Sequence, residues 1–337
     1  MPKVREFGVG FESLSAREFA SHAKRAEEMG FGTFWVPEDP FMRGAFTLAA
    51  AVACSTSKMK VGLGIVNPYT RHPSLTAMEF AALDELSGGR AIMGIGTGIK
   101  DWIEGRLKIP YTRPASAMRE MVEITRALFR GEVVSYAGRV FQSDRMKLNF
   151  KPARAGIPIY LGVLGPKNME MTGEIADGLL LSVMSSPAYV KFATEHLRVG
   201  LQKSNRDATD FPVSAYILSS ISENERAARD ALRPFLAMLI SIMAPQPENP
   251  IFATAGLAPD TIKSFGESFS RGVVPKDMVT DAMVDTFAIA GSPARCRENL
   301  ARLVEAGMNA PVFFEAPGVP PQKTFDDVYT HLMPHFS

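Results

Sequence analysis

The first hundred residues alternate short apolar segments with helical ones, and this alternation restricts the fold more than any other feature. Apolar runs that stop at turn residues predict buried strands at 6–11, 33–36, 61–66 and 90–95. Helical patterns cover the intervals at 15–30, 46–57 and 73–86. Because the connections are short, consecutive strands should run parallel and be joined by right-handed helical crossovers.

The rest of the chain continues this pattern with two interruptions. Further strands are predicted at 158–162, 178–182, 213–219 and 310–314, with helices at 114–130, 166–176, 187–203 and 292–306. A turn within 132–151 predicts a hairpin outside the repeat, and 222–290 reads as a helical insertion broken by a proline-rich stretch at 244–250. The expected fold is one (β/α)8 TIM barrel domain over 1–337, with a hairpin insertion and a helical insertion.

Composition excludes several other classes of protein. The 37 Lys and Arg residues balance 36 Asp and Glu residues, so no basic face for nucleic acid is expected. The longest apolar run, 236–244, is too short to cross a membrane, and the N-terminus lacks the apolar core of a signal peptide. We therefore expect a cytoplasmic protein. Cys54 and Cys296 match no metal-ligand spacing; no metal site is expected, and Cys54 is predicted to lie in the core.

Polar residues follow the predicted third strand more densely than any other strand. The stretch after 61–66 brings Asn67, Tyr69, Thr70, Arg71 and His72 before a helix that starts at Pro73. In a parallel barrel, the loops at the carboxyl ends of the strands carry the chemistry. This loop is therefore predicted to form the floor of an active site.

The loops after the first two strands add carboxylates to the same rim. Glu12 follows the first strand, and Glu38 and Asp39 follow the second. A carboxyl group at this rim can accept or donate a proton in catalysis.

Glycine-rich loops after the fourth and fifth strands suggest an anion site. Gly96-Thr97-Gly98 follows one strand, and Leu164-Gly165-Pro166-Lys167 follows the next and opens a helix. Backbone N–H groups in such loops, together with the helix N-terminus, favour a phosphate group. A phosphate-bearing cofactor is predicted here, with Ser182 beside it after the sixth strand.

Three sequence blocks carry a family resemblance: NPYTRHP, LDELSGGRAIMGIGTG and PIYLGVLGPKNMEMTGEIADGLLLS. With these blocks the chain resembles the luciferase-like flavin oxidoreductase superfamily, and within it the methylenetetrahydromethanopterin reductases that use the deazaflavin coenzyme F-420. The resemblance implies an (α/β)8 barrel, usually a homodimer, with a flavin-type ring against the third strand. It also implies a non-prolyl cis peptide at Gly64-Ile65, ring contacts from Val66 and Asn67, and a cofactor tail near the two glycine loops.

The chain departs from the reductase pattern at three acidic positions. It has Gly10 where the reductases carry a glutamate on the first strand, Glu38-Asp39 in place of an acid followed by histidine, and Ala45-Phe46 where a further glutamate falls. We expect instead a less polar substrate pocket lined by Phe11, Phe41, Met42 and Phe46.

Three functions are compatible with these residues. The first is hydride transfer between F-420 or a flavin such as FMN and a small organic substrate, with Glu38 or Asp39 moving the proton. The second is a two-component monooxygenase that receives reduced FMN from a separate reductase, with Arg71 and His72 stabilising negative charge. The third, from another class, is a cofactor-free barrel with a binding or structural role.

Overall fold

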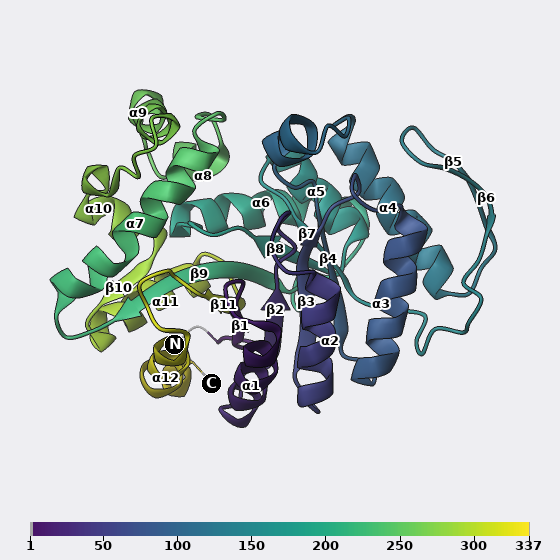
Figure 1. The fold of residues 1–337 in the computed structure, drawn as a ribbon, viewed down its shortest axis with the longest axis horizontal. Helices are drawn as coiled ribbons and strands as arrows, with labels where there is room; N and C mark the ends of the chain where they lie inside the picture. Colours follow the sequence, from purple (N-terminus) through teal and green to yellow (C-terminus); the bar gives the residue numbers. More distant parts are fainter. Residues whose placement is uncertain (1–2, 337) are drawn as a thin grey trace.

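Eight parallel strands close into a barrel in the computed structural model, which describes residues 3–336 (Figure 1). Around the barrel, β8 pairs with β9, β9 with β11, and β11 with β1, so the sheet has no free edge at this point. The barrel strands are, in chain order, β1 (Gly8–Gly10), β2 (Thr33–Val36), β3 (Lys60–Val66), β4 (Ala91–Gly96), β7 (Ile159–Gly162), β8 (Gly178–Leu181), β9 (Val213–Ile221) and β11 (Ala310–Phe314).

Helices cover the outside of this barrel. Their ends follow local sequence signals: Ser15 and Glu18 form a capping box, and Gly88 ends a helix in the left-handed conformation at φ 68°. The covering helices are α1 (Ala16–Glu28), α2 (Ala45–Ser55), α3 (Pro73–Ser87), α4 (Pro114–Phe129), α5 (Pro166–Ile175), α6 (Pro187–Lys203), α11 (Pro293–Glu305) and α12 (Pro321–His331). The barrel predicted from the sequence is confirmed.

Two segments stand outside the repeat. The antiparallel hairpin of β5 (Val134–Ala137) and β6 (Gln142–Met146) lies at the edge of the molecule beside α3 and α4 (Figure 1). Between β9 and β10 (Ile289–Gly291) the chain forms an all-helical insertion of α7 (Glu225–Met243), α8 (Pro250–Thr254), α9 (Pro259–Ser270) and α10 (Asp281–Phe287). Single turns occur at η1 (Asp101–Arg106), η2 (Lys276–Met278) and η3 (Met333–His335).

Large side chains fill the inside of the barrel. Trp35 packs against Tyr160, with ring centroids 5.7 Å apart, and meets Tyr216 edge-on at 6.5 Å. The Trp35 ring occupies space that side chains at Gly62 and Gly64 of β3 would otherwise take. A Cβ at Gly62 would lie 2.5 Å from the ring, and one at Gly64 would lie 2.9 Å from it. The interior is thus a packed core, and functional groups can gather only at its ends.

Three details of the sequence analysis were wrong. The helical insertion does not extend to 290, because residues 289–291 form β10 and pair with Ser219–Ile221 at the end of β9. The first strand is shorter than 6–11 and covers Gly8–Gly10. Cys54 is exposed on α2 and does not lie in the core. Asp84 is buried and stabilises the turn before β4, because its carboxylate accepts hydrogen bonds from the Ala91 N–H and from Arg154.

Candidate active site

The predicted site residues lie at the carboxyl ends of six barrel strands, in two groups. The acids Glu12, Glu38 and Asp39 follow β1 and β2. The predicted cofactor residues lie in the last residues of the next four strands around the barrel, β3, β4, β7 and β8, or in the loops that follow them. The barrel order therefore brings together an acidic half and a glycine-rich half of a single rim.

The acidic half is organised by a carboxylate that sequence analysis did not single out. Glu315 follows β11, next to β1 in the barrel, and is buried. Its Oε1 accepts the N–H groups of Glu12 and Ser13, each at 2.6 Å, and its Oε2 accepts the Ser13 hydroxyl at 2.7 Å. This carboxylate fixes the loop that carries Glu12 and places that side chain beside Asp39.

Glu12 and Asp39 share a hydrogen bond between their carboxyl groups. The pKa of Glu12 is raised to about 8, first by burial. The charge and hydrogen bond of Asp39 and the charge of Glu315 raise it further. Burial also raises the pKa of Asp39, although the hydrogen bond from Glu12 opposes this. Two adjacent, partly buried carboxyls cannot both ionise easily, so the pair holds one proton at neutral pH, on Glu12.

Glu38 belongs to a separate ion-pair network. Arg71 Nη1 donates to the Glu38 carboxylate, and Arg71 Nε lies 3.4 Å from Glu79 Oε2. The guanidinium also stacks on the Phe46 ring, 4.9 Å from its centroid. Burial raises the pKa of Glu38, while Arg71 lowers it. Of the two acids predicted to move a proton, Asp39 is therefore the one placed in the proton-holding pair.

Replacing Arg71 tests this network. Arg71→Lys keeps the charge but loses the planar fork that reaches both carboxylates and the stacking on Phe46. We expect the free energy of unfolding to fall by about 1–2 kcal/mol, measured by urea denaturation. The exposed Arg113→Lys serves as a control, and equal stability of both variants would show that the network adds nothing.

β3 supplies the floor between the two halves. Its Gly64-Ile65 peptide bond is cis, as the resemblance implied, and the pairing register with β4 shifts between Leu63 and Val66. The Tyr216 hydroxyl, from β9 across the barrel, donates to the Gly64 carbonyl at 3.0 Å. Burial, with Asp39 and Glu12 nearby, raises the pKa of Tyr216, so its hydroxyl stays protonated as a donor.

Asn67 and His72 shape the loop after β3. The Asn67 Oδ1 accepts the N–H groups of Tyr69 and Thr70, both at 3.0 Å, which folds the chain into a tight Asx turn. His72 caps α3: its Nδ1 accepts the Ser74 N–H at 3.2 Å, and burial lowers its pKa. The ring is therefore neutral with its proton on Nε2.

The glycines that end β4 and β7 give room to a β3 side chain. A Cβ at Gly96 would lie 3.0 Å from Ile65 Cγ1, and a Cβ at Gly162 would lie 2.7 Å from Ile65 Cγ2. Ile65 thus lies across the ends of β4 and β7, the next two strands around the barrel. Gly98 adopts φ 68°, which turns the chain sharply after Thr97.

The N-terminus of α5 is open. Gly165 occupies the N-cap, Pro166 the first turn, and a Cβ at Gly165 would meet no other described atom within 4 Å. The Leu164 carbonyl accepts the Tyr189 hydroxyl at 3.2 Å, which anchors this loop. Lys167 is exposed and lies 3.0 Å from Glu170. This end can accept an anion.

After β8, the Ser182 carbonyl accepts the Ser185 hydroxyl at 2.7 Å.

The apolar pocket residues do not all meet at the rim. Phe41 and Met42 are exposed after β2, and Phe46 lies under Arg71. Phe11 is fully buried and packs against Phe325 of α12, 5.0 Å between ring centroids. Its prediction as a pocket residue was wrong, because its side chain points to the helices outside the barrel.

Within residues 3–336, no group of His, Cys, Asp and Glu side chains is arranged to hold a metal ion. The same residues contain no helix with the length and apolarity needed to span a bilayer.

The barrel is closed and parallel, and its carboxyl end carries paired acids and an open helix N-terminus. This arrangement is typical of (β/α)8-barrel enzymes. The chain belongs to the luciferase-like monooxygenase family, which it matches over residues 6–310. It is a luciferase-like oxidoreductase.

Curated relatives extend over the whole chain. The 5,10-methylenetetrahydromethanopterin reductase of Archaeoglobus fulgidus is 32% identical and covers 98% of this chain and 99% of its own length. The enzyme of the same name from Methanopyrus kandleri is 30% identical, with 99% of each chain covered.

Solved structures agree with the fold. The coenzyme F-420 dependent tetrahydromethanopterin reductase from Methanopyrus kandleri superposes with a TM-score of 0.89 at 27% identity, covering 99% of this chain and 100% of that chain. An F-420-dependent secondary alcohol dehydrogenase, solved with an F-420-acetone adduct, has a TM-score of 0.75 at 19% identity, covers 100% of both chains, and shows the shared fold alone.

Proposed function

We propose that this protein transfers a hydride between coenzyme F-420 and a small organic substrate. The proposal rests on the Glu12–Asp39 carboxyl pair, in which the pKa of Glu12 is raised, at the rim of a barrel related over its whole length to F-420-dependent reductases. Hydride transfer to a carbon–carbon or carbon–heteroatom double bond needs one proton as well, and a carboxyl with a pKa near neutrality can supply it.

The described residues fit such a cofactor. The open α5 N-terminus, at Gly165, would hold the phosphate of its tail, with Lys167 adding positive charge. The β3 segment from Gly64 to Asn67 would lie against the ring, and Gly96, Thr97, Gly98 and Ser182 would border the chain between them. When bound, F-420 supplies a two-electron hydride donor or acceptor.

In this proposal Glu12 and Asp39 handle the proton, and the other site residues position them or the floor. Glu12 holds the proton for the substrate, and Asp39 accepts the hydrogen bond that keeps the proton there. Glu315 positions Glu12 through two backbone N–H groups. Tyr216 orients the floor by donating to the Gly64 carbonyl. Arg71 is already engaged by Glu38 and Glu79, so it shapes the rim and does not carry the proton.

A fluorescence titration with F-420 and with FMN, each oxidised and reduced, tests the choice of cofactor. We expect saturable binding of F-420, with affinity at least about tenfold above that of FMN. Preferential binding of reduced FMN with oxygen consumption would replace the proposal with the two-component monooxygenase. Binding of neither would leave the cofactor-free barrel. In either enzymatic case, we propose that a separate reductase supplies the reduced cofactor.

We also propose that the protein is a homodimer that pairs through α2 and α3, which pack side by side (Figure 1). On the outer face of α3, Leu75, Met78 and Leu86 are 51%, 44% and 50% exposed. The outer face of α2 offers small side chains, among them Thr47 and Cys54. A two-fold axis would set the large residues of one copy against the small residues of the other and bury both.

Leu75→Glu tests the pairing. A charge within the proposed apolar interface should convert the dimer to a monomer, measured by sedimentation equilibrium. Val133→Glu, at an apolar residue that is 59% exposed on the hairpin side, should leave the dimer intact. A monomeric wild-type protein, or a dimer unaffected by Leu75→Glu, would refute this interface.

A further inference from the structure

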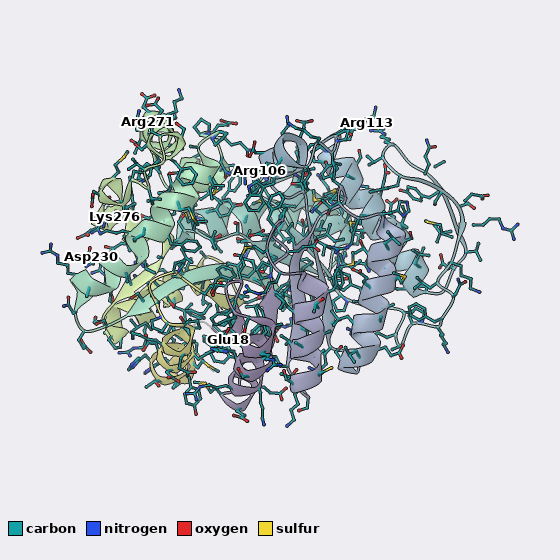
Figure 2. The ribbon with its side chains drawn as sticks, viewed as in Figure 1. Glu18, Arg106, Arg113, Asp230, Arg271 and Lys276 are labelled. Atoms are coloured by element: carbon teal, nitrogen blue, oxygen red, sulfur yellow. The ribbon has the colours of Figure 1, made fainter. Side chains whose placement is uncertain are left out.

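The connection between β4 and α4, residues 97–113, is the longest strand-to-helix connection at the barrel rim. The next longest, after β2, covers 37–44. Such connections usually span about two to six residues, and loops of more than about twelve are commonly functional. Arg106 and Arg113, both exposed, mark this β4 segment in Figure 2. Its length asks for a role beyond joining a strand to a helix.

The β4 segment packs against residues of the proposed cofactor site. Ile103 is 1% exposed, and a Cβ at Gly98 would lie 2.9 Å from its Cδ1. The same Cβ would lie 3.6 Å from the Cβ of Asn67. The Ile109 N–H donates to the Ile103 carbonyl at 3.0 Å, which folds the segment back on itself. Gly98 therefore lies between the β4 segment and the Asn67 turn that follows β3.

Tyr111, near the end of the β4 segment, joins the loops after β3 and β4. Its ring packs on the Tyr69 ring, with centroids 4.7 Å apart and planes inclined by 32°. The Tyr69 hydroxyl donates to the Thr112 carbonyl at 3.1 Å. Tyr111 also shares a side-chain hydrogen bond with Thr97. Burial raises the pKa of Tyr69 and of Tyr111, so both hydroxyls keep their protons at neutral pH.

These contacts concern the rim and not the barrel core. Tyr69 and Tyr111 are both partly exposed, and the eight strands close without them. Thr97 is one of the residues proposed above to border the cofactor. A hydroxyl has one donor and two acceptor positions, so its bond to Tyr111 sets its orientation and still leaves capacity for a ligand.

We propose that Tyr111 is a positioning residue with two contacts. Its ring holds the β4 segment against Tyr69 in the loop after β3, and its hydroxyl orients the Thr97 hydroxyl toward the cofactor. The second role rests on the proposed function, whereas the first does not need a cofactor. Tyr111 acts through Thr97, so its effect falls on cofactor affinity and not on the proton transfer assigned to Glu12.

Hydrogen exchange followed by mass spectrometry tests the first role on the full chain without cofactor. Tyr111→Ala removes the ring contact, and the amides of 99–109 should exchange at least about fivefold faster than in the wild type. Tyr329→Ala, at a tyrosine of α12 that is 49% exposed, should leave these amides unchanged. Thermal unfolding shows that both variants are folded. Wild-type exchange over 99–109 in Tyr111→Ala would overturn this role.

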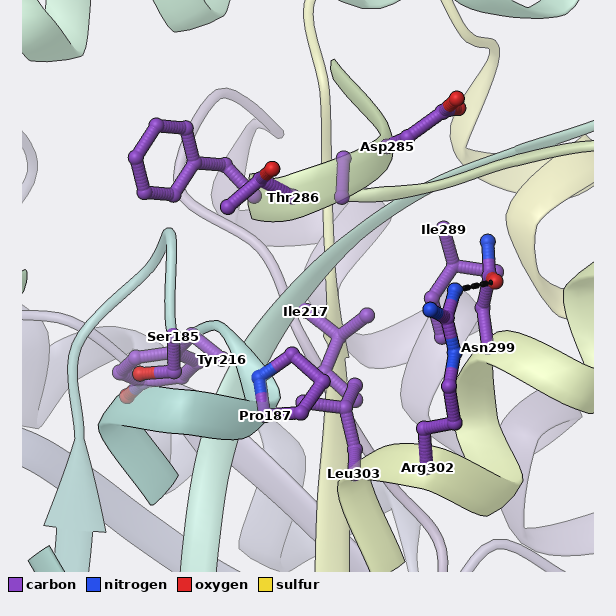
Figure 3. Close-up of a pocket in the computed structure, with 12 residues that line it drawn as sticks. Ser185, Pro187, Tyr216, Ile217, Asp285, Thr286, Ile289, Asn299, Arg302 and Leu303 are labelled. Atoms are coloured by element: carbon purple, nitrogen blue, oxygen red, sulfur yellow. Dashed lines mark hydrogen bonds between the residues drawn. The ribbon is translucent and has the colours of Figure 1, made fainter. Parts of the chain in front are cut away.

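F-420 titration followed by fluorescence tests the second role. Tyr111→Phe keeps the ring and loses the hydroxyl, so F-420 affinity should fall about threefold to tenfold while kcat at saturating cofactor is unchanged. Thr97→Val should weaken binding at least as much, and adding Tyr111→Phe to it should cause no further loss. Thr286→Val is the matched control: this hydroxyl donates within α10, beside the hollow drawn in Figure 3, and F-420 binding should be that of the wild type.

The outcomes separate this inference from the proposed function. Unchanged F-420 affinity in Tyr111→Phe, or losses that add in the double variant, would overturn the positioning of Thr97 in a protein that binds F-420. A wild-type protein that binds no F-420 would refute the proposed function and the role of Thr97 together. Faster exchange over 99–109 in Tyr111→Ala would still support the contact with Tyr69.

Discussion

Glu12→Gln is expected to lower kcat about 10²–10⁴-fold while leaving F-420 affinity unchanged. The amide keeps the shape of the side chain and can still donate to Asp39, but it cannot release a proton to the substrate. Steady-state kinetics measure kcat, and cofactor fluorescence measures binding. The exposed Glu28→Gln on α1 is the matched control and should show wild-type kinetics.

The pH dependence gives an independent test of the same residue. In the wild type, substrate reduction should decline as the pH rises through about 8, where Glu12 loses its proton. Because the folded-state pKa is raised from 4.5, this carboxyl stabilises the fold fully below pH 4.5 and loses that contribution as the pH rises to about 8. Glu12→Gln should flatten the stability profile over this interval. A wild-type rate that is constant from pH 6 to 9 would exclude Glu12 as the proton donor.

Gly200→Ala is expected to reduce the free energy of unfolding by about 3 kcal/mol. A Cβ at Gly200 of α6 would lie 1.8 Å from the Glu170 carbonyl oxygen of α5, and one at Gly173 would lie 2.4 Å from the Leu197 carbonyl oxygen. The two helices touch backbone to backbone here, so no side chain can move aside. Chemical denaturation measures the loss.

Gly156→Ala is the control for this substitution. Its Cβ would meet no described atom within 4 Å, so stability should change by less than about 0.5 kcal/mol. Because α5 begins at the proposed phosphate site, a displaced α5 should also weaken cofactor binding in Gly200→Ala. If Gly200→Ala is as stable as the wild type, α5 and α6 can move apart without loss of free energy of unfolding, and the prediction is wrong.

Local signals account for what the sequence could predict. The helix expected at 187–203 matches α6 at both ends, because Ser186 caps it and proline opens it. The eight barrel strands were found because each is an apolar run bounded by turn residues. β10 was missed because three residues carry too little pattern, and their strand geometry depends on the distant end of β9.

The site was harder to predict than the fold, since its contacts join residues far apart in the chain. Glu315 directly follows the predicted eighth strand, so its position at the rim could have been read from the sequence. Its bonds to Glu12 and Ser13 could not, because they depend on barrel closure. Tyr216 lies within a strand, where nothing in the pattern separates a residue with a function from a core aromatic.

The bonds from Glu315 to Glu12 and Ser13 span 303 and 302 residues, and they have a consequence for synthesis on the ribosome. The first strand and its acid emerge early, but β11 and Glu315 emerge near the end of translation. Until then, β1 lacks one neighbour and the Glu12 loop lacks the carboxylate that holds it. A nascent chain can therefore carry nearly all of its helices while the proposed proton donor is still unassembled. If Glu12 is the donor, catalytic competence arrives with the last barrel strand, in a single late step.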